Sequence, residues 1–450
     1  MNRENLKGVR RTLTRLMSLG LLVGAASCDT DVVNPGPIES DFLDQVASQY
    51  AITNGAGRAL GDALNWIAYT NSAVAREVHP SGSTGSFGIT PEQQRGELND
   101  DEVGTQWENA HRARFLVSDG IRRLQGVTGE EDFDQENLDQ LFLYGGYASR
   151  LLGEAMCNSV FDGGPPGSSD LHLDSAIAYF TTAMNSANAD IALAAQAGRA
   201  SAYQQKGEWG NAVSDAQAVL NADPDFSYAL PYFDIGDDNQ GNRIYIAGDA
   251  NPYKAHSQIF TWIAEYNPQD TTVIGGIADA DPRVAWQVSG ENGDAASSCC
   301  GLIQWFPQQK YTNDDAPIEL SSAEEMQLIL AEDALRNGGD IGTAMGIVNE
   351  LRTAAGLTDL VPETGITIEE ALTFYKREHA IEMWLEGRRL PAMRRWNDAG
   401  DTESTLQPLE QVGDGDQSTG SHLETREFCF PISRAERQTN ENVPIDFEPR

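Results

Sequence analysis

Basic residues are scarce in this 450-residue chain: 31 lysines and arginines stand against 68 aspartates and glutamates, giving a formal net charge of −37. Nucleic-acid binding depends on lysine and arginine replacing phosphate counterions, so the surplus of acid excludes it. Anionic lipid surfaces repel such a chain as well. Hydrophobic residues still make up 40% of the sequence, which predicts a folded core. The length exceeds that of a single core and predicts two lobes or an array of repeats.

Histidine is also scarce, with six residues scattered along the chain and no His-Glu-x-x-His pattern. The sequence has no Gly-x-Ser-x-Gly motif between strand and helix patterns, and no paired Cys-x-x-Cys spacing. It therefore predicts no catalytic residue, no metal site and no cofactor. Two segments, Asp237–Asn239 and Asp414–Asp416, have the oxygen ligands that calcium prefers. Neither fills a twelve-residue calcium loop, and we interpret both as solvated turns.

Long apolar runs are absent after the N-terminus, so no later segment is predicted to span a membrane. Residues 1–27 carry a net charge of +4 and contain the apolar stretch 16–26, as in a secretory signal peptide. Small residues then lead to Cys28, which resembles the lipobox of bacterial lipoproteins. We expect lipidation at Cys28 and a polar tether over 28–41, the alternative being an ordinary signal peptide with an incidental cysteine.

Four further cysteines, Cys157, Cys299, Cys300 and Cys429, would face the oxidising environment of an exported protein. Four cysteines permit three connectivities. The adjacent pair Cys299 and Cys300 could bond to each other only through a strained eight-membered ring. We therefore expect one of these two to pair with Cys157 or Cys429.

Helical periodicity dominates the body of the chain. Small and apolar residues predict a helical pair over 193–206 and 210–221, with Ala200, Tyr203, Ala212 and Pro224 at tetratricopeptide-repeat positions. A second pair is predicted at 322–335 and 340–354, and further amphipathic helices at 40–75, 100–125, 137–157 and 174–187. The predicted fold is mainly α, a tetratricopeptide-like helical-hairpin scaffold with a loop-rich excursion.

The excursion occupies residues 226–320, between a helical region at 42–225 and another at 321–450. It is rich in Gly, Asn, Asp and aromatic residues, which predicts loops with short strands. Long loops in a helical body commonly carry function. Aromatic rings can stack on the apolar faces of sugars while polar side chains bind the hydroxyls. The ligand-binding candidates are Trp305, Trp286, Tyr245, Tyr253, Tyr266, Asn239, Arg243 and, from the loop at 81–88, Phe87. We expect Trp262 to be core and Trp209 to pack within the repeats, and for Trp305 core and ligand face are equally open.

The last third contains three segments with recognisable motif residues, 322–357, 376–396 and 428–442. The motif residues are Glu332, Asn349, Arg352, Gly356, Leu357, Arg377, Glu382, Glu386, Gly387, Arg388, Arg395, Trp396, Pro431, Ile432, Glu436 and Asn440. Together they resemble the SusD/RagB family of outer-membrane nutrient-binding lipoproteins. Asp281-Pro282-Arg283 and Lys310-Tyr311 also look like family features. His379, Pro391 and Ser433 depart from the family pattern at scaffold positions.

Glu378, Glu382 and Glu386 are spaced four apart and share one helix face, where like charges repel. One interpretation is a carboxylate pair for glycoside hydrolysis, which needs two acids across a cleft. We favour a structural ion network that includes Arg388 and Arg395. The cations expected to neutralise these acids are Arg352, Arg377, Arg388, Arg389, Arg394 and Arg395.

The resemblance implies a protein that performs no chemistry. It would be lipid-anchored at the outer membrane, facing outside, and would bind an oligosaccharide or a peptide. It would pass that nutrient to a SusC-like TonB-dependent outer-membrane channel. Two alternatives stay open from the residues alone: a secreted helical glycoside hydrolase, and a tetratricopeptide adaptor that binds only other proteins.

Overall fold

The computed structural model describes residues 40–82, 84–234, 240–249, 254–259, 261–265, 281–293, 303–359, 362–401, 426–444 and 447. The chain divides into two compact units, residues 1–45 and 46–450. Within the first, the described residues carry one short helix, α2 (Ser40–Leu43). Cys28 lies outside the described residues, so its lipidation stays a prediction. None of the helices in the described ranges is long and apolar enough to cross a membrane.

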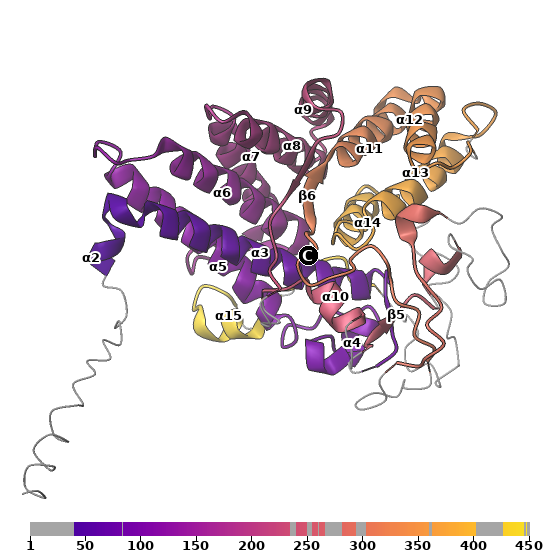
Figure 1. Ribbon diagram of the computed structural model, residues 1–450, viewed down its shortest axis with the longest axis horizontal. Helices are drawn as coiled ribbons and strands as arrows, with labels where there is room; N and C mark the ends of the chain where they lie inside the picture. The colour runs from indigo at the N-terminus through magenta and orange to yellow at the C-terminus, as the bar shows by residue number, and fades with distance from the viewer. Residues whose placement is uncertain are drawn as a thin grey trace, which may run out of the picture. The chain divides into compact units, whose positions relative to one another are not determined.

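Six long helices form the first part of the second unit. They are α3 (Gln49–Val74), α5 (Gly104–Gly126), α6 (Gln135–Ala155), α7 (Asp170–Ala183), α8 (Ala189–Gln205) and α9 (Trp209–Ala222), with the short α4 (Pro91–Gln94) between the first two. Consecutive helices from α5 to α9 pack against one another, as Figure 1 shows. Side-chain caps fix where several helices begin: Asp134 accepts from the backbone of Glu136, and Asn188 from that of Asp190. The mainly helical fold predicted from periodicity is confirmed.

Small residues let these helices approach closely, as the repeat pattern predicted. The ring of Phe180 on α7 lies between Gly146 on α6 and Gly198 on α8. A Cβ atom at either glycine would lie 2.3 Å from that ring, well inside van der Waals contact. The close packing of α6, α7 and α8 therefore depends on these two glycines.

The C-terminal helices form the second part of this unit. They are α11 (Ala323–Asp333), α12 (Ile341–Ala354), α13 (Ile368–Glu382), α14 (Arg389–Asp398) and α15 (Arg434–Thr439), with a π-turn, η5 (Ala334–Gly338), between α11 and α12. Helix α11 packs against α9 and so continues the helical array. A separate hydrophobic cluster, which includes Leu335, Met345, Tyr375 and Trp396, fills the space between α11, α12, α13 and α14. The helical pair predicted at 322–335 and 340–354 is present.

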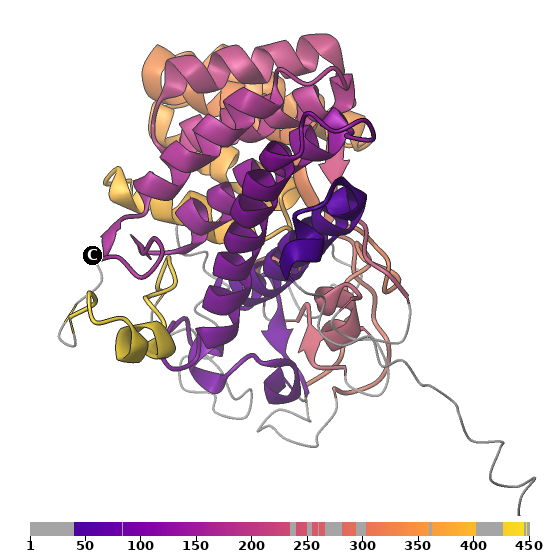
Figure 2. The same cartoon turned by 90° about the vertical axis from the view of Figure 1, so that its left-hand side faces the viewer.

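Among the residues that the structure describes, six short strands form three antiparallel pairs. They are β1 (His79–Pro80) with β5 (His256–Ser257), β2 (Asn158–Ser159) with β3 (Gly167–Ser168), and β4 (Ser227–Ala229) with β6 (Glu319–Ser322). The last pair brings together the two ends of the excursion, and a bulge interrupts it at Tyr228 and Ala229. Between these ends the described elements are α10 (Arg243–Gly248), β5 and two single-turn helices, η3 (Trp262–Glu265) and η4 (Pro282–Val284). Figure 2 shows α10 and β5 gathered near one end of the long helices.

A disulfide joins Cys157, just after α6, to Cys429 near the C-terminus. The expectation that Cys299 or Cys300 would pair with one of these two is therefore wrong. The backbone explains the pairing, because the Cys157 amide donates to the carbonyl of Phe430 at 2.9 Å and the Phe430 amide donates to Ala155 at 2.8 Å. These bonds place the two cysteines side by side across 272 residues of sequence. Cys299 and Cys300 lie outside the described residues.

Candidate functional site

Helix α3 positions the first part of the excursion. The Asn65 side chain on α3 donates to the carbonyl of Gly241 at 2.8 Å and accepts from the amide of Arg243 at 2.9 Å. Asn242 then caps α10 by accepting from the amides of Ile244 and Tyr245. The start of α10 is therefore fixed to the scaffold, although the residues before it have no helical pattern.

Two of the predicted ligand contacts form part of the scaffold. Arg243 is buried, and its guanidinium carbon lies 3.7 Å from the ring centre of Trp66. The same guanidinium donates to the carbonyl of Phe87, whose ring is also buried. The half-buried Trp66, which the sequence prediction passed over, belongs to this group of residues. Trp66 lies in a helix, whereas the predicted ligand contacts were sought in loops.

Trp286 is fully buried, with 1% of its surface exposed. Its indole stacks on Phe306 at a centroid distance of 5.0 Å and an angle of 11°. Trp286 thus presents no open ring face to a ligand in this structure. Trp262 is likewise buried, as predicted for a core residue.

Trp305 lies at the surface of the excursion and is only half-buried. Its indole nitrogen donates to the Gly248 carbonyl at 2.9 Å, and the Lys254 ammonium lies 5.0 Å from its ring centre. The ammonium lies over one face of the ring, and the side chain as a whole stays partly exposed. Tyr245 is half-buried as well. Asn239, Tyr253 and Tyr266 lie outside the described residues, so among the candidates whose side chains are described, Trp305 and Tyr245 are the two that are not buried.

The three glutamates of α13 and the turn after it are paired with cations from the excursion. Arg283 binds Glu378 and lies 2.5 Å from Glu382, and it also binds Asp281 on its own turn at 2.6 Å. Lys310 lies 2.6 Å from Glu386. A cavity of about 400 Å³ lies beside these groups, lined by Arg283, Lys310, Glu382 and Glu386 among others.

The cations that neutralise these acids are therefore only partly those predicted. Of the arginines proposed for this role, Arg352 lies 4.0 Å from Glu378. Arg388 pairs instead with Glu154 and Glu325, and Arg395 pairs with Glu332. Each predicted member of the ion network does pair with an opposite charge, but the pairs fall into four groups that share no residue, centred on Arg283, Lys310, Arg388 and Arg395. Arg283 and Lys310 carried a sequence signal as family-like features, yet nothing in the local pattern linked them to these acids.

Burial has the largest effect on the pKa values of the glutamates beside Arg283 and Lys310. It raises the pKa of Glu382 to about 7 against the opposing effect of Arg283. It raises the pKa of Glu386 to about 7 in the same way, with Lys310 opposing. Glu378 and Glu382 bind the same nitrogen of Arg283, so they do not face each other across an open cleft as a glycosidase pair requires.

No group of three or more histidine, cysteine or acidic side chains that could hold a metal occurs among the residues that the structure describes. The two segments weighed as calcium sites, 237–239 and 414–416, fall outside those residues.

Residues 323–444 match the model of the SusD family. This confirms the resemblance predicted from the C-terminal motifs. No curated protein matches the chain.

Solved structures share the fold over most of the chain. Surface glycan-binding protein A from Bacteroides uniformis has 16% identity and a TM-score of 0.62, and covers 87% of this chain and 98% of its own. A SusD superfamily protein from Bacteroides thetaiotaomicron has 14% identity and a TM-score of 0.61, with 89% and 98% covered. A SusD-like carbohydrate-binding protein from Bacteroides vulgatus has 14% identity and a TM-score of 0.56, with 78% and 83% covered. Such identities show the fold and leave the ligand open.

Proposed function

From a C-terminal match to the SusD family and a fold shared along the chain, we propose that this protein is a cell-surface lipoprotein that binds an oligosaccharide nutrient. It would pass that nutrient to a partner TonB-dependent outer-membrane transporter. The observation that carries the proposal is the shared fold, since two of the structures compared above are described as binding glycans or carbohydrates. The half-buried Trp305 at the surface of the excursion supports it.

The ion pairs of Glu378, Glu382 and Glu386 support binding without catalysis. Glu378, Glu382 and Glu386 each contact a cation of the excursion, and these contacts join the excursion to α13 and the turn after it. A general acid or nucleophile would need a carboxyl group directed at the ligand. We therefore assign the glutamates to structure and the ligand contacts to the aromatic surface.

The ligand face would include Trp305 and Tyr245, with Lys254 beside the indole. An aromatic ring with a few polar neighbours is the usual composition of a small-molecule site. The acidic chain would favour neutral or cationic ligands over polyanionic glycans at long range. Lipidation at Cys28 would hold this acidic body at a membrane surface that its charge alone would avoid, each buried CH₂ contributing about 0.8 kcal/mol.

Titration against a panel of neutral polysaccharides tests the binding proposal. We expect saturable binding to at least one polymer and at least a tenfold loss in Trp305→Ala, about 1.4 kcal/mol. Phe115→Ala removes an aromatic side chain that is 57% exposed on α5 and serves as the matched control, with unchanged affinity. Binding to no polymer, or equal binding by Trp305→Ala, would contradict the proposal and favour a protein-binding adaptor.

Turnover of the same panel tests the enzymatic alternative. Hydrolysis that Glu382→Gln abolishes while the fold is retained would show a glycosidase. The partner is tested by purification from outer membranes, where we expect a large β-barrel channel to accompany the chain. Cys28→Ala should release the protein from the membrane fraction and remove incorporated fatty acid.

A further inference from the structure

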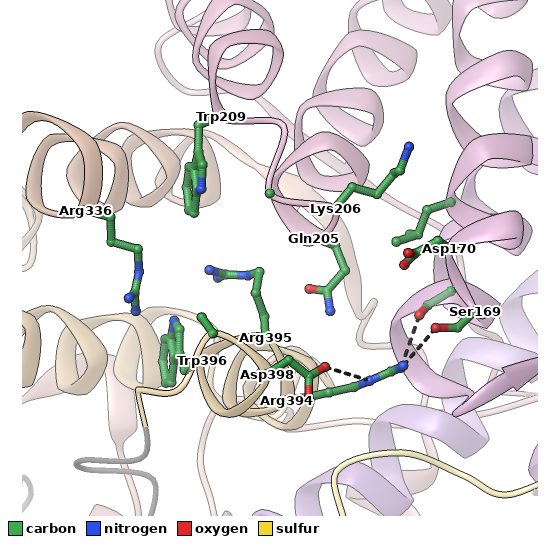
Figure 3. Close-up of a pocket in the computed structure, with 14 residues that line it drawn as sticks. Ser169, Asp170, Gln205, Lys206, Trp209, Arg336, Arg394, Arg395, Trp396 and Asp398 are labelled. Carbon is green, nitrogen blue, oxygen red and sulfur yellow. Dashed lines mark hydrogen bonds and ion pairs between the residues drawn. The ribbon is translucent and has the colours of Figure 1, made fainter. Parts of the chain in front are cut away.

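A pocket of about 230 Å³ lies apart from the excursion, where α7, α8 and α9 face α14 (Figure 3). Trp209 reaches into it from the start of α9, and Arg395 points toward Trp209 from α14, with Trp396 beside it. The guanidinium carbon of Arg395 lies 5.6 Å from the ring centre of Trp209 and 6.0 Å from that of Trp396. The amide of Gln205 also points inward.

Of the two indoles, only Trp209 is available for stacking. Trp396 is 2% exposed, and its nitrogen donates to Glu332 at 2.9 Å. Trp209 is partly exposed and lines the pocket. The repeat-packing role predicted for Trp209 therefore leaves part of its ring uncovered, and that part can stack on the apolar face of a ligand ring.

Positive charge is in excess beside this ring. Arg395 and Arg336 share one carboxylate, Glu332, at 2.5 and 2.6 Å. Arg336 and Lys376 share a second carboxylate, Asp401, at 3.0 and 2.5 Å. Among the charged residues that line the pocket, four are basic (Lys206, Arg336, Arg394 and Arg395) and two are acidic (Asp170 and Asp398). Nε of Arg395 is buried with no hydrogen-bond partner among the residues described.

Arg394 is the basic residue of the opposite wall, to which the acidic Asp170 also belongs. Its guanidinium donates to the carbonyl of Met156 and to the hydroxyl of Ser169, both at 2.8 Å, so neutral groups hold it. Its carboxylate partner, Asp398, lies 3.7 Å away with 66% of its side chain exposed. Such a pair is strongly screened by water and offsets little of the charge.

The size of the pocket limits the ligand to a single ring. Pockets for drug-sized molecules usually measure about 300–1,000 Å³, and this one is smaller. We propose that it is a second binding site, for one acidic sugar unit such as a hexuronic acid. The ring would stack on Trp209, the carboxylate would meet Arg395, and Gln205 would bind a hydroxyl. The inference rests on the proposed function only in taking the ligand to be a sugar.

Three probes test the charge requirement on the full chain without any substitution: D-glucuronate, its methyl ester and D-glucose. Calorimetric titration should show glucuronate binding at least about tenfold more tightly than the other two, since a hydrogen bond to a charged group contributes about 1.5–3 kcal/mol. Higher salt should weaken glucuronate binding. Equal affinity for all three probes, or no saturable binding of glucuronate, would overturn the proposal.

Substitutions locate the site. Trp209→Ala should weaken glucuronate binding at least tenfold, and Trp209→Phe should retain most of it because a ring remains. Phe115→Ala is the matched control, because this exposed ring does not line the pocket and its loss should leave glucuronate affinity unchanged. Loss of glucuronate binding in Trp305→Ala, with none in Trp209→Ala, would place the ligand on the excursion and overturn the pocket site.

The two proposals fail separately. Glucuronate binding that depends on Trp209, with no polysaccharide bound by the chain, would sustain the pocket and contradict the excursion site. Polysaccharide binding that depends on Trp305, without glucuronate binding, would do the reverse. Circular dichroism of each variant confirms that the fold is retained.

Discussion

Two buried carboxylate centres in the C-terminal region differ sharply in their surroundings. Glu332 on α11 accepts hydrogen bonds from five side chains, at 2.5–3.0 Å: Arg395, Arg336, Trp396, Tyr375 and Gln204. Burial would raise its pKa, but the two arginines overcome this and lower it to about 2. Glu382 and Glu386 have few donors, and burial raises the pKa of each to about 7.

The contrast shows that the donors around a buried acid, and not its burial alone, decide whether it is charged. The Glu332 centre joins α8, α11, η5, α13 and α14, all parts of the helical scaffold. The Arg283 and Lys310 centre joins the excursion to α13 and the turn after it. The scaffold therefore holds a fully satisfied charge, while the excursion is attached through acids that titrate near neutral pH.

Removing the acid of the satisfied centre should have the largest effect. Glu332→Gln keeps the size of the side chain but leaves Arg395 without its buried countercharge. Breaking a buried ion pair in this way costs about 3–5 kcal/mol. Urea unfolding at pH 7 measures the loss. Glu324→Gln, an exposed acid in the first turn of the same helix, is the control and should change stability by less than about 0.5 kcal/mol.

Removing the cation of the second centre should cost less and should depend on pH. Arg283→Leu leaves Glu378, Glu382 and Asp281 without this shared partner. We expect a loss of about 2–4 kcal/mol at pH 8. At pH 5 the loss should shrink, because the carboxyl groups can take up protons instead. An equal loss at both pH values would show that packing, not charge, is responsible.

The two centres predict opposite pH dependences in the unmodified protein. Glu382 and Glu386 have folded-state pKa values above the usual 4.5, so the stability they contribute is present at low pH and is lost as pH rises toward 7. Glu332 has a lowered pKa, so its contribution is present above 4.5 and is lost as pH falls toward 2. Thermal unfolding should therefore show greatest stability near about pH 5.

A single substitution tests the predicted loss of stability between pH 5 and pH 7. Glu382→Gln removes one of three described acids whose pKa burial raises to about 7, the others being Glu77 and Glu386, so the fall in stability between pH 5 and 7 should become shallower. An unchanged slope would mean that Glu382 does not titrate in this range.

The smallest expected effect is at Lys310. Lys310→Met removes the cation 2.6 Å from Glu386 and the hydrogen bond to the Trp384 carbonyl, but retains most of the apolar side chain. We expect a loss of about 1 kcal/mol at pH 8 and less at pH 5. Lys206→Met, at a pair whose acids are exposed, is a comparison that should be nearly neutral. A larger loss of stability in Lys206→Met than in Lys310→Met would contradict the prediction that the pair with the buried acid contributes more.

Local patterns predicted the helices well because each helix depends on residues near one another in sequence. The periodicity around Ala200 and Ala212 placed α8 and α9 within a few residues of their observed limits. The four-residue spacing of Glu378, Glu382 and Glu386 likewise singled out these acids, but it did not link them to Arg283 or Lys310. Arg283 and Glu378 are 95 residues apart, and no helical spacing connects them.

The predicted ligand contacts also show that local sequence identifies residue types but not their burial or their distant neighbours. Composition predicted ligand contacts among the aromatic residues of the excursion and at Phe87. In the structure Trp286 and Phe87 are buried, whereas Trp305 and Tyr245 are only half-buried. Trp209 and Arg395 lie 186 positions apart and share a pocket only because α9 and α14 face each other. The pairing of Cys157 with Cys429 likewise depends on backbone bonds formed after folding.

By itself the sequence determined a mainly helical, strongly acidic chain with a lipobox-like N-terminus and the C-terminal motifs of a nutrient-binding family. These properties depend on composition, periodicity and short motifs, which the order of residues contains directly. Tertiary structure alone decided which acids are charged, which cations hold them, which rings remain uncovered and which cysteines pair. Each of these depends on contacts and burial between segments far apart in the chain, and only packing brings those segments together.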